Sequence, residues 1–241
     1  MRKRYFAIIV VIFFITGGFV SITGNTNAII TIRFKNWVGN KELTLFDTTY
    51  INPFGEPFVI SKFRYYISHI SFTDAANKEI SLPDNYYLVN EADSLSKTIQ
   101  LPAAAGIKSI SFLIGVDSAR NVSGVQTGSL DPINGMFWTW NSGYVFAKLE
   151  GQSDSSHAPA HNFAWDVGGF RPHENALRKI KLTVPASHSS TDKTIVVNAD
   201  VLKWFNAVHP LQISQSPVCH QPGNLAMQIA DNYSTMFSVA P

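Results

Sequence analysis

Most of this chain alternates between apolar and polar residues with the two-residue period of a β-strand. In residues 29–34, Ile30, Ile32 and Phe34 would lie on one face of a strand, with Thr31 and Arg33 on the other. Pro, Gly, Asn, Asp and Ser cluster between such segments and signal frequent turns. Strands alternating with long helices, the pattern of a parallel sheet, are not seen in the sequence. The sequence therefore predicts an all-β fold, which we expect to be an antiparallel β-sandwich.

Further segments of the chain carry the same strand signal. We expect strands at Ile29–Phe34, Glu42–Phe46, Phe58–Phe72, Tyr86–Asn90, Ile107–Ile114, Tyr144–Leu149, Phe163–Val167, Lys179–Val184 and Thr194–Val201. The third is so long that we expect it to be bent or bulged. Residues 200–205 are typical of a short helix or turn. Residues 225–237 have apolar side chains at helical spacing after Gly223-Asn224, which predicts a short C-terminal helix that closes the sandwich.

The segment from Gly115 to Gly143 is a long connection without clear strands. Loops of this length are uncommon in compact domains unless they are functional. We therefore expect this one long loop to carry function, and we expect Asp117, Asp131 and Tyr144 to support it.

Composition excludes several other classes of protein. The chain of 241 residues is 45% hydrophobic, 12% aromatic and 15% charged, which excludes a disordered chain and a coiled coil. One cysteine excludes an internal disulfide framework and a cysteine-rich metal site. A net charge of +2 argues against nucleic acid as the main partner. The sequence has no repeat, low-complexity tract or linker, so we expect a single domain, residues 29–241. No catalytic sequence motif is found, so we expect that the protein is not an enzyme.

The first 28 residues are typical of a signal peptide. Three basic residues at positions 2–4 precede an unbroken apolar run at positions 5–15, and small or polar residues follow up to Ala28. Removing these three cations leaves 16 basic against 17 acidic residues, a net charge of −1. We expect a periplasmic or extracellular protein with no membrane span after signal removal. The alternative is an uncleaved N-terminal anchor, for which the apolar run is short.

Two tryptophans in alternation, Trp138 and Trp140, make the long loop unusual. In a strand both indoles would face the same way. One interpretation is a plug in the core or at the end of the sandwich, because tryptophan buries a large area. The others are a platform on which sugar rings stack and a redox-active tryptophan.

The residues around this pair resemble the signature of the MbnP-like family. The motif is Leu130-Asp131-Pro132-x-x-Gly135-Met136-Phe137-Trp138-x-Trp140-x-Ser142-Gly143-Tyr144, followed by Lys148-Leu149-Glu150-Gly151. Shorter pieces agree with it: residues 63–68, 115–117, 168–171, 175–177, 230–232 and 236–237. The resemblance spans nearly the whole chain after residue 28.

The resemblance implies an exported bacterial protein with a β-sandwich core. In the family's namesake a di-haem cytochrome c peroxidase-like partner oxidises a tryptophan to kynurenine, and the product binds copper; related copper proteins use two histidines plus a kynurenine. It implies that Trp138 or Trp140 is the oxidisable residue here. Kynurenine carries an aromatic amine and a carbonyl where indole has only an N–H donor. The oxidation would therefore create a metal ligand.

Histidines would have to supply the other copper ligands. From their places beside the family motifs we select His69 and His220, and we add Cys219 as a thiolate ligand. The alternatives are solvated or hydrogen-bonded histidines and a buried, inert thiol. Relatives often have a histidine just before the double glycine, whereas this chain has Asp166 in the run Trp165-Asp166-Val167-Gly168-Gly169. If the copper hypothesis fails, we expect a module that binds carbohydrate or another surface ligand through exposed aromatic side chains.

Overall fold

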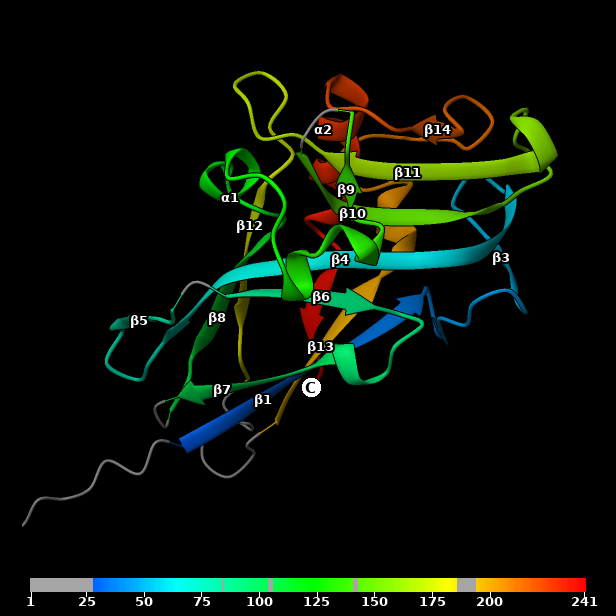
Figure 1. Ribbon diagram of the computed structural model, residues 1–241. Coiled ribbons are helices and arrows are strands. Elements are labelled where there is room, and N and C mark those ends of the chain that lie inside the picture. The colour runs from blue at the N-terminus through cyan, green and yellow to red at the C-terminus, as the bar shows by residue number, and fades with distance from the viewer. Residues whose placement is uncertain (1–27, 84, 104–105, 141–142, 186–193) are drawn as a thin grey trace, which may run out of the picture.

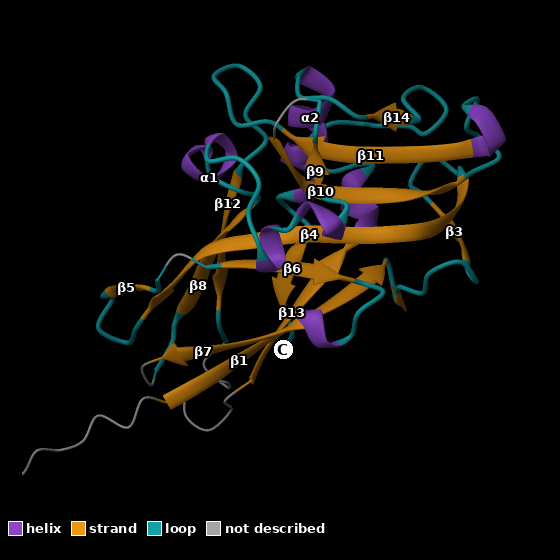
Figure 2. Cartoon of the chain, in the orientation of Figure 1, coloured by secondary structure: helices purple, strands orange, loops and turns teal. Residues whose placement is uncertain are grey.

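Two packed β-sheets form the protein (Figure 1). The computed structural model describes residues 28–83, 85–103, 106–140, 143–185 and 194–241. The predicted signal peptide falls almost entirely outside the described residues. Figure 2 shows strands throughout the structure and only short helices, so the predicted all-β sandwich is confirmed.

The smaller sheet is built around the first strand. Its strands are β1 (Ala28–Val38), β2 (Lys41–Glu42), β7 (Thr98–Ala103), β13 (Thr194–Asp200) and β15 (Phe237–Val239). The alternation predicted for β1 is confirmed, because Ile30, Ile32 and Phe34 are all buried. β1 pairs antiparallel with β7 but parallel with β13, so this sheet is mixed.

The larger sheet has the order β12-β8-β4-β10-β11-β14, and further strands pair with β4 and β10. Its strands are β3 (Thr49–Ile51), β4 (Pro57–Thr73), β5 (Glu79–Ser81), β6 (Tyr86–Asn90), β8 (Ser109–Ile114), β9 (Phe137–Trp138), β10 (Gly143–Gln152), β11 (Asn162–Gly168), β12 (Arg178–Thr183) and β14 (Val218–Cys219). β11 and β14 are parallel, and the other pairs in this sheet are antiparallel among the described strands.

The long strand β4 contains the expected bulge. Its register with β8 shifts between Ser68 and Ser71, and His69 within the shift has a φ of 50°. A non-glycine residue in the left-handed region is uncommon, and it reverses the side-chain alternation locally. The prediction of a bulged strand is confirmed.

Aromatic rings join the two sheets. Phe34 of β1 packs edge-to-face against Tyr65 of β4, Phe112 of β8 and Phe237 of β15, with ring centroids 5.9, 6.2 and 6.3 Å apart. Edge-to-face packing places the positive edge of one ring against the negative face of another. These rings form the centre of the core.

The helices are α1 (Ser118–Val122), α2 (Asn224–Tyr233) and the 3-10 turns η1 (Leu95–Lys97), η2 (Gly128–Leu130), η3 (Pro132–Asn134), η4 (Pro159–His161) and η6 (Val201–Trp204). The C-terminal helix is confirmed at α2 but ends four residues early, because residues 237–239 pair with β13 as a strand. Within the described residues no helix is long and apolar enough to span a membrane.

The predicted strand Glu42–Phe46 is mostly wrong. Only Lys41–Glu42 is a strand, and Phe46 has a φ of 71°, which a regular strand does not accommodate. The apolar alternation there arises because Leu43 is buried as a single residue of a connection.

The long connection after β8 lies over the outward face of the larger sheet. Arg64 donates to the carbonyl of Asn134 at 2.7 Å, and the hydroxyl of Tyr66 donates to the carbonyl of Ser129 at 2.8 Å. The hydroxyl of Tyr144 donates to the carbonyl of Leu130 at 2.9 Å. Side chains of β4 and β10 thus hold the backbone of this loop, which places its last strand, β9, beside β10.

Candidate functional site

A row of polar side chains crosses the outward face of the larger sheet. Lys148 of β10 pairs in register with Arg64 of β4 on one side and with Asp166 of β11 on the other. Trp165 pairs with Cys219 of β14, so the next residue, His220, comes level with Asp166. Residues level with each other in a sheet face the same way. We name these four residues, Arg64, Lys148, Asp166 and His220, the polar row.

Asp166 is the buried centre of the polar row. Its Oδ2 accepts from Lys148 Nζ at 2.9 Å and lies 3.2 Å from His220 Nδ1. Its other oxygen, Oδ1, is buried without a partner among the described residues. Burial raises the pKa of Asp166, and the Lys148 ammonium offsets only part of that rise. A buried carboxylate oxygen without a donor is costly, which makes it a candidate for interaction with a cation.

Lys148 is shared between two carboxylates. It also donates to Glu150 Oε1 at 2.8 Å, and Lys62 contacts Glu150 Oε2 at 2.6 Å. Burial alone would raise the pKa of Glu150, but hydrogen bonds from Lys148 and Lys62 outweigh it and lower that pKa. The ammonium of Lys148 is therefore fixed in place.

His220 presents a half-exposed imidazole at the end of the polar row. Its side chain is 51% exposed, Nδ1 faces Asp166, and Nε2 has no partner among the described residues. A carboxylate on one ring nitrogen fixes the tautomer and the orientation of the ring, and leaves the other nitrogen to bind a metal. The geometry therefore fits a histidine that binds a metal through Nε2.

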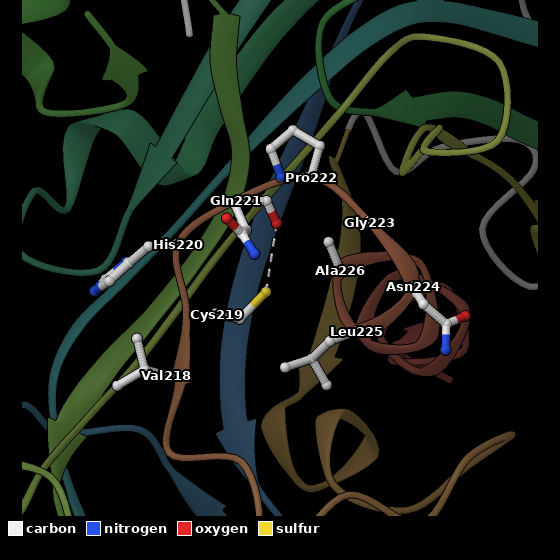
Figure 3. Close-up of a pocket in the computed structure, with 9 residues that line it drawn as sticks. All are labelled: Val218, Cys219, His220, Gln221, Pro222, Gly223, Asn224, Leu225 and Ala226. Atoms are coloured by element: carbon white, nitrogen blue, oxygen red, sulfur yellow. Dashed lines mark hydrogen bonds between the residues drawn. The ribbon is translucent and has the colours of Figure 1, made fainter. Parts of the chain in front are cut away.

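Cys219 points away from His220, as Figure 3 shows. The thiol is buried, lies 3.9 Å from the carbonyl of Gln221, and has its pKa raised to about 12 by burial. Residues 218–226 line a hollow of about 350 Å³ beside it. Adjacent residues of a strand face opposite sides of the sheet. Cys219 and His220 therefore do not converge on one ion, and the thiol stays protonated.

Trp138 lies on the same face as the polar row. A Cβ added at Gly168 would come within 2.9 Å of its six-membered ring. Gly168 and Asp166 are two residues apart on β11 and so share a face of the sheet. Trp138 is only 7% exposed, whereas Trp140 is 64% exposed, with ring centroids 5.7 Å apart.

The other predicted ligand, His69, lies elsewhere on the sheet. It is in β4, and two strands, β10 and β11, separate β4 from β14. Its Nε2 lies 3.7 Å from Asp117 Oδ2, and its ring packs against Tyr86 at 5.9 Å. The structure does not bring His69, His220 and Cys219 together. Among the described residues, no group of three or more His, Cys, Asp and Glu side chains is arranged to hold a metal.

Of the three residues expected to support the loop, Asp117 and Asp131 lie within it, and Tyr144 follows it and donates to the carbonyl of Leu130. Asp117 caps α1 by accepting from the backbone of Arg120, and Asp131 caps η3 by accepting from Ile133. The hydroxyl of Tyr86 also donates to Asp117 through a short hydrogen bond. Burial raises the pKa of Asp117, but the bonds from Tyr86 and Arg120 lower it more.

Sequence reasoning missed Asp166 and Lys148 as part of the site. The alternation of β11 does place Asp166 opposite the buried Trp165 and Val167, on the polar face. Its burial and its pairing with Lys148 depend on the register between β10 and β11, which residue spacing does not show.

Comparison with known proteins identifies one family. The family profile described as MbnP matches residues 27–221. Among solved structures, MbnP from Methylosinus trichosporium is similar, with a TM-score of 0.55 and 15% sequence identity over 82% of each chain. That identity is low, so the likeness to this structure concerns the fold. No curated protein is a significant match for the chain.

Proposed function

This chain belongs to the MbnP family, and from that premise we propose that it is an exported protein that binds copper. His220 and one oxidised tryptophan supply ligands in this proposal. The protein is not itself an enzyme; it is the substrate of a di-haem, cytochrome c peroxidase-like partner that oxidises the tryptophan. The basic and apolar N-terminal pattern supports export to the periplasm or the cell exterior.

The position of His220 is the observation that carries the proposal. Its Nδ1 lies 3.2 Å from a buried carboxylate, its side chain is half exposed, and Asp166 beside it shares a face of the sheet with Trp138. Copper stands at the top of the divalent affinity order and takes imidazole readily. Asp166 acts on the metal indirectly, by orienting the ring of His220.

The modified tryptophan adds a ligand that indole cannot provide. Oxidation of Trp138 to kynurenine would place an aromatic amine and a carbonyl on the face of the polar row. Trp165 and Trp204 are fully buried, and Trp37 donates to Asn198 at 3.0 Å, so all three serve packing. His69 and Cys219 have no part in this site.

The second candidate function, a platform for sugar rings, is less well supported. Such a platform needs neighbouring exposed rings, but only Trp140 of the pair is exposed. The close contact between one exposed and one buried indole suits oxidation better than stacking on a sugar.

Copper titration of matched variants tests the proposal. The full chain is co-expressed with a di-haem partner, its tryptophan peptide is examined by mass spectrometry, and copper is titrated against a competing chelator. His157 is exposed in the connection between β10 and β11, so His157→Gln is the control. We expect modified wild-type protein and His157→Gln to bind copper equally, and His220→Gln to lose binding. Asp166→Asn should weaken binding by about 10–100-fold, as loss of a carboxylate that orients a ligand does.

Two results would contradict the proposal. One is full copper affinity in His220→Gln. The other is an unmodified tryptophan peptide in protein from cells whose partner enzyme is active.

A further inference from the structure

The two tryptophans of the motif differ in their access to solvent. Trp138 is 7% exposed, and its ring packs over Gly168, where a Cβ would not fit. Trp140 is 64% exposed and lies with its ring centroid 5.7 Å from that of Trp138, at an interplanar angle of 40°. A redox centre held by another protein can therefore contact the ring of Trp140, whereas the ring of Trp138 is almost wholly covered.

We infer that Trp140 is the port through which an external one-electron oxidant draws electrons from Trp138. This inference rests on the proposed function, because it concerns the oxidation of the same tryptophan. It assigns different roles to two residues that the sequence leaves equivalent. Trp140 passes electrons to the oxidant, and Trp138 is the residue that is oxidised to kynurenine.

The step consists of two electron transfers and one proton loss. Trp140 gives one electron to the oxidant, for example a high-valent haem, which is reduced by one electron. Trp138 then gives one electron to the oxidised Trp140, which returns to its original state. The resulting indole radical cation on Trp138 loses its N–H proton to solvent base, and no other bond forms or breaks in this step.

Two nearby tyrosines do not offer an easier route inward. The ring of Tyr144 packs against those of Phe137 and Tyr66, at 5.0 and 6.0 Å. Burial raises the pKa of both Tyr144 and Tyr66. Oxidation of a tyrosine requires loss of the phenolic proton, which burial disfavours. The electron removed by the oxidant therefore comes from the tryptophan pair and not from Tyr144 or Tyr66.

Photochemical oxidation of the purified full chain tests this role without the partner or copper. Light and a cobalt(III) ammine acceptor convert tris(bipyridine)ruthenium(II) in solution into a one-electron oxidant. In air-saturated buffer the tryptophan radical captures dioxygen, and peptide mapping by mass spectrometry locates the added oxygen. We compare wild type with Trp140→Phe and Trp140→Tyr, which cover Trp138 with similar rings but differ in ease of oxidation.

We expect oxygen on Trp138 in wild type and in Trp140→Tyr, and its loss in Trp140→Phe. Trp37→Phe removes a tryptophan of the smaller sheet and should leave oxidation of Trp138 at the wild-type level. Acrylamide quenching of tryptophan fluorescence, compared between the two Trp140 variants, checks that both substitutions leave Trp138 equally covered. Equal oxidation of Trp138 in Trp140→Phe and Trp140→Tyr would overturn the inference.

The two proposals can fail separately. If the chain binds no copper but Trp138 is oxidised in Trp140→Tyr and not in Trp140→Phe, the role of Trp140 in electron transfer stands and the copper proposal fails. If the chain binds copper through His220 but Trp138 is oxidised equally in both variants, the copper proposal stands and the role of Trp140 in electron transfer fails.

Discussion

Gly168 shows how one residue without a side chain positions an indole. The space where its Cβ would stand is taken by the backbone carbonyl of Tyr144 and the ring of Trp138. A larger residue would displace the ring of Trp138 from the sheet, because the other neighbour of the added Cβ is the backbone carbonyl of Tyr144, which the strand holds in place. The double glycine thus has a packing role next to the candidate site.

We predict that Gly168→Ala destabilises the fold by about 1–3 kcal/mol, the usual cost of overpacking a filled site. It should also expose Trp138, which increases quenching of its fluorescence by acrylamide. Chemical denaturation measures the first effect. Gly124→Ala places its Cβ in open space but at a φ of 79°, so it measures the cost of backbone strain, which Gly168 does not have, without any overpacking. Unchanged stability of Gly168→Ala, with Trp138 still protected from acrylamide, would contradict this account.

The ligand residues show what the sequence can and cannot predict at this scale. Cys219 and His220 are adjacent, and alternation in a strand already predicts that they face opposite ways. His69 appeared suitable because of the motif beside it, but its place in the bulge of β4 directs it to Asp117. Asp166 gains its role from a neighbouring strand, which no local pattern shows.

At the scale of elements, a buried carboxylate fastens the start of β4 to the connection before β14. Glu56 accepts from the backbone of Ile213 and Ser214 at 2.8 and 2.9 Å, and from Asn52 at 2.6 Å. Burial raises the pKa of Glu56, but these hydrogen bonds lower it more, so the net pKa lies below the ordinary value. The charged form therefore stabilises the fold.

The sign of this shift predicts how stability depends on pH. The contribution of Glu56 is fully present above the unfolded pKa of about 4.3 and is lost as the pH falls through the lower folded pKa. We expect Glu56→Gln to cost about 1–3 kcal/mol at neutral pH, because an amide leaves one backbone N–H without an acceptor. Urea unfolding at several pH values should show this difference shrinking in acid. The exposed Glu42→Gln is the control, and a constant difference at all pH values would refute the explanation.

The strands that could be predicted from the sequence are those whose own residues show the hydrophobic pattern of a strand. β6 has the predicted bounds, and β4, β10, β11, β12 and β13 lie within a few residues of prediction. In β12 and β13 one buried face imposes alternation, whereas β10 and β11 are buried on both faces and are marked by continuous apolar, β-prone runs. β2, β9 and β14 have two residues each and exist only through their partners. The sequence pattern assigns the start of β15 to the helix, because its apolar residue Phe237 also fits helical spacing. Short strands at sheet edges depend on tertiary pairing, which the sequence pattern does not encode.

At the scale of the whole molecule, the last element completes the core. The family profile ends at residue 221, yet Phe237 of β15 packs on Phe34 and lies 5.2 Å from Phe112. The segment after the matched region is therefore part of the sandwich. The candidate site lies on the outward face of the larger sheet, opposite this core, and so depends on the core for its rigidity.

We predict that one core substitution loosens both sheets together. Phe34→Ala removes a 1% exposed ring that touches both sheets, and we expect a loss of about 3–5 kcal/mol, the usual cost of such a cavity. Ile133→Ala, at an 88% exposed position of the long loop, should leave stability unchanged. Because the sheets share this core, circular dichroism and tryptophan fluorescence, to which the fully buried Trp165 and Trp204 contribute, should report one transition in Phe34→Ala. Two separate transitions would mean that the sheets fold independently and that the outward site does not draw its rigidity from the shared core.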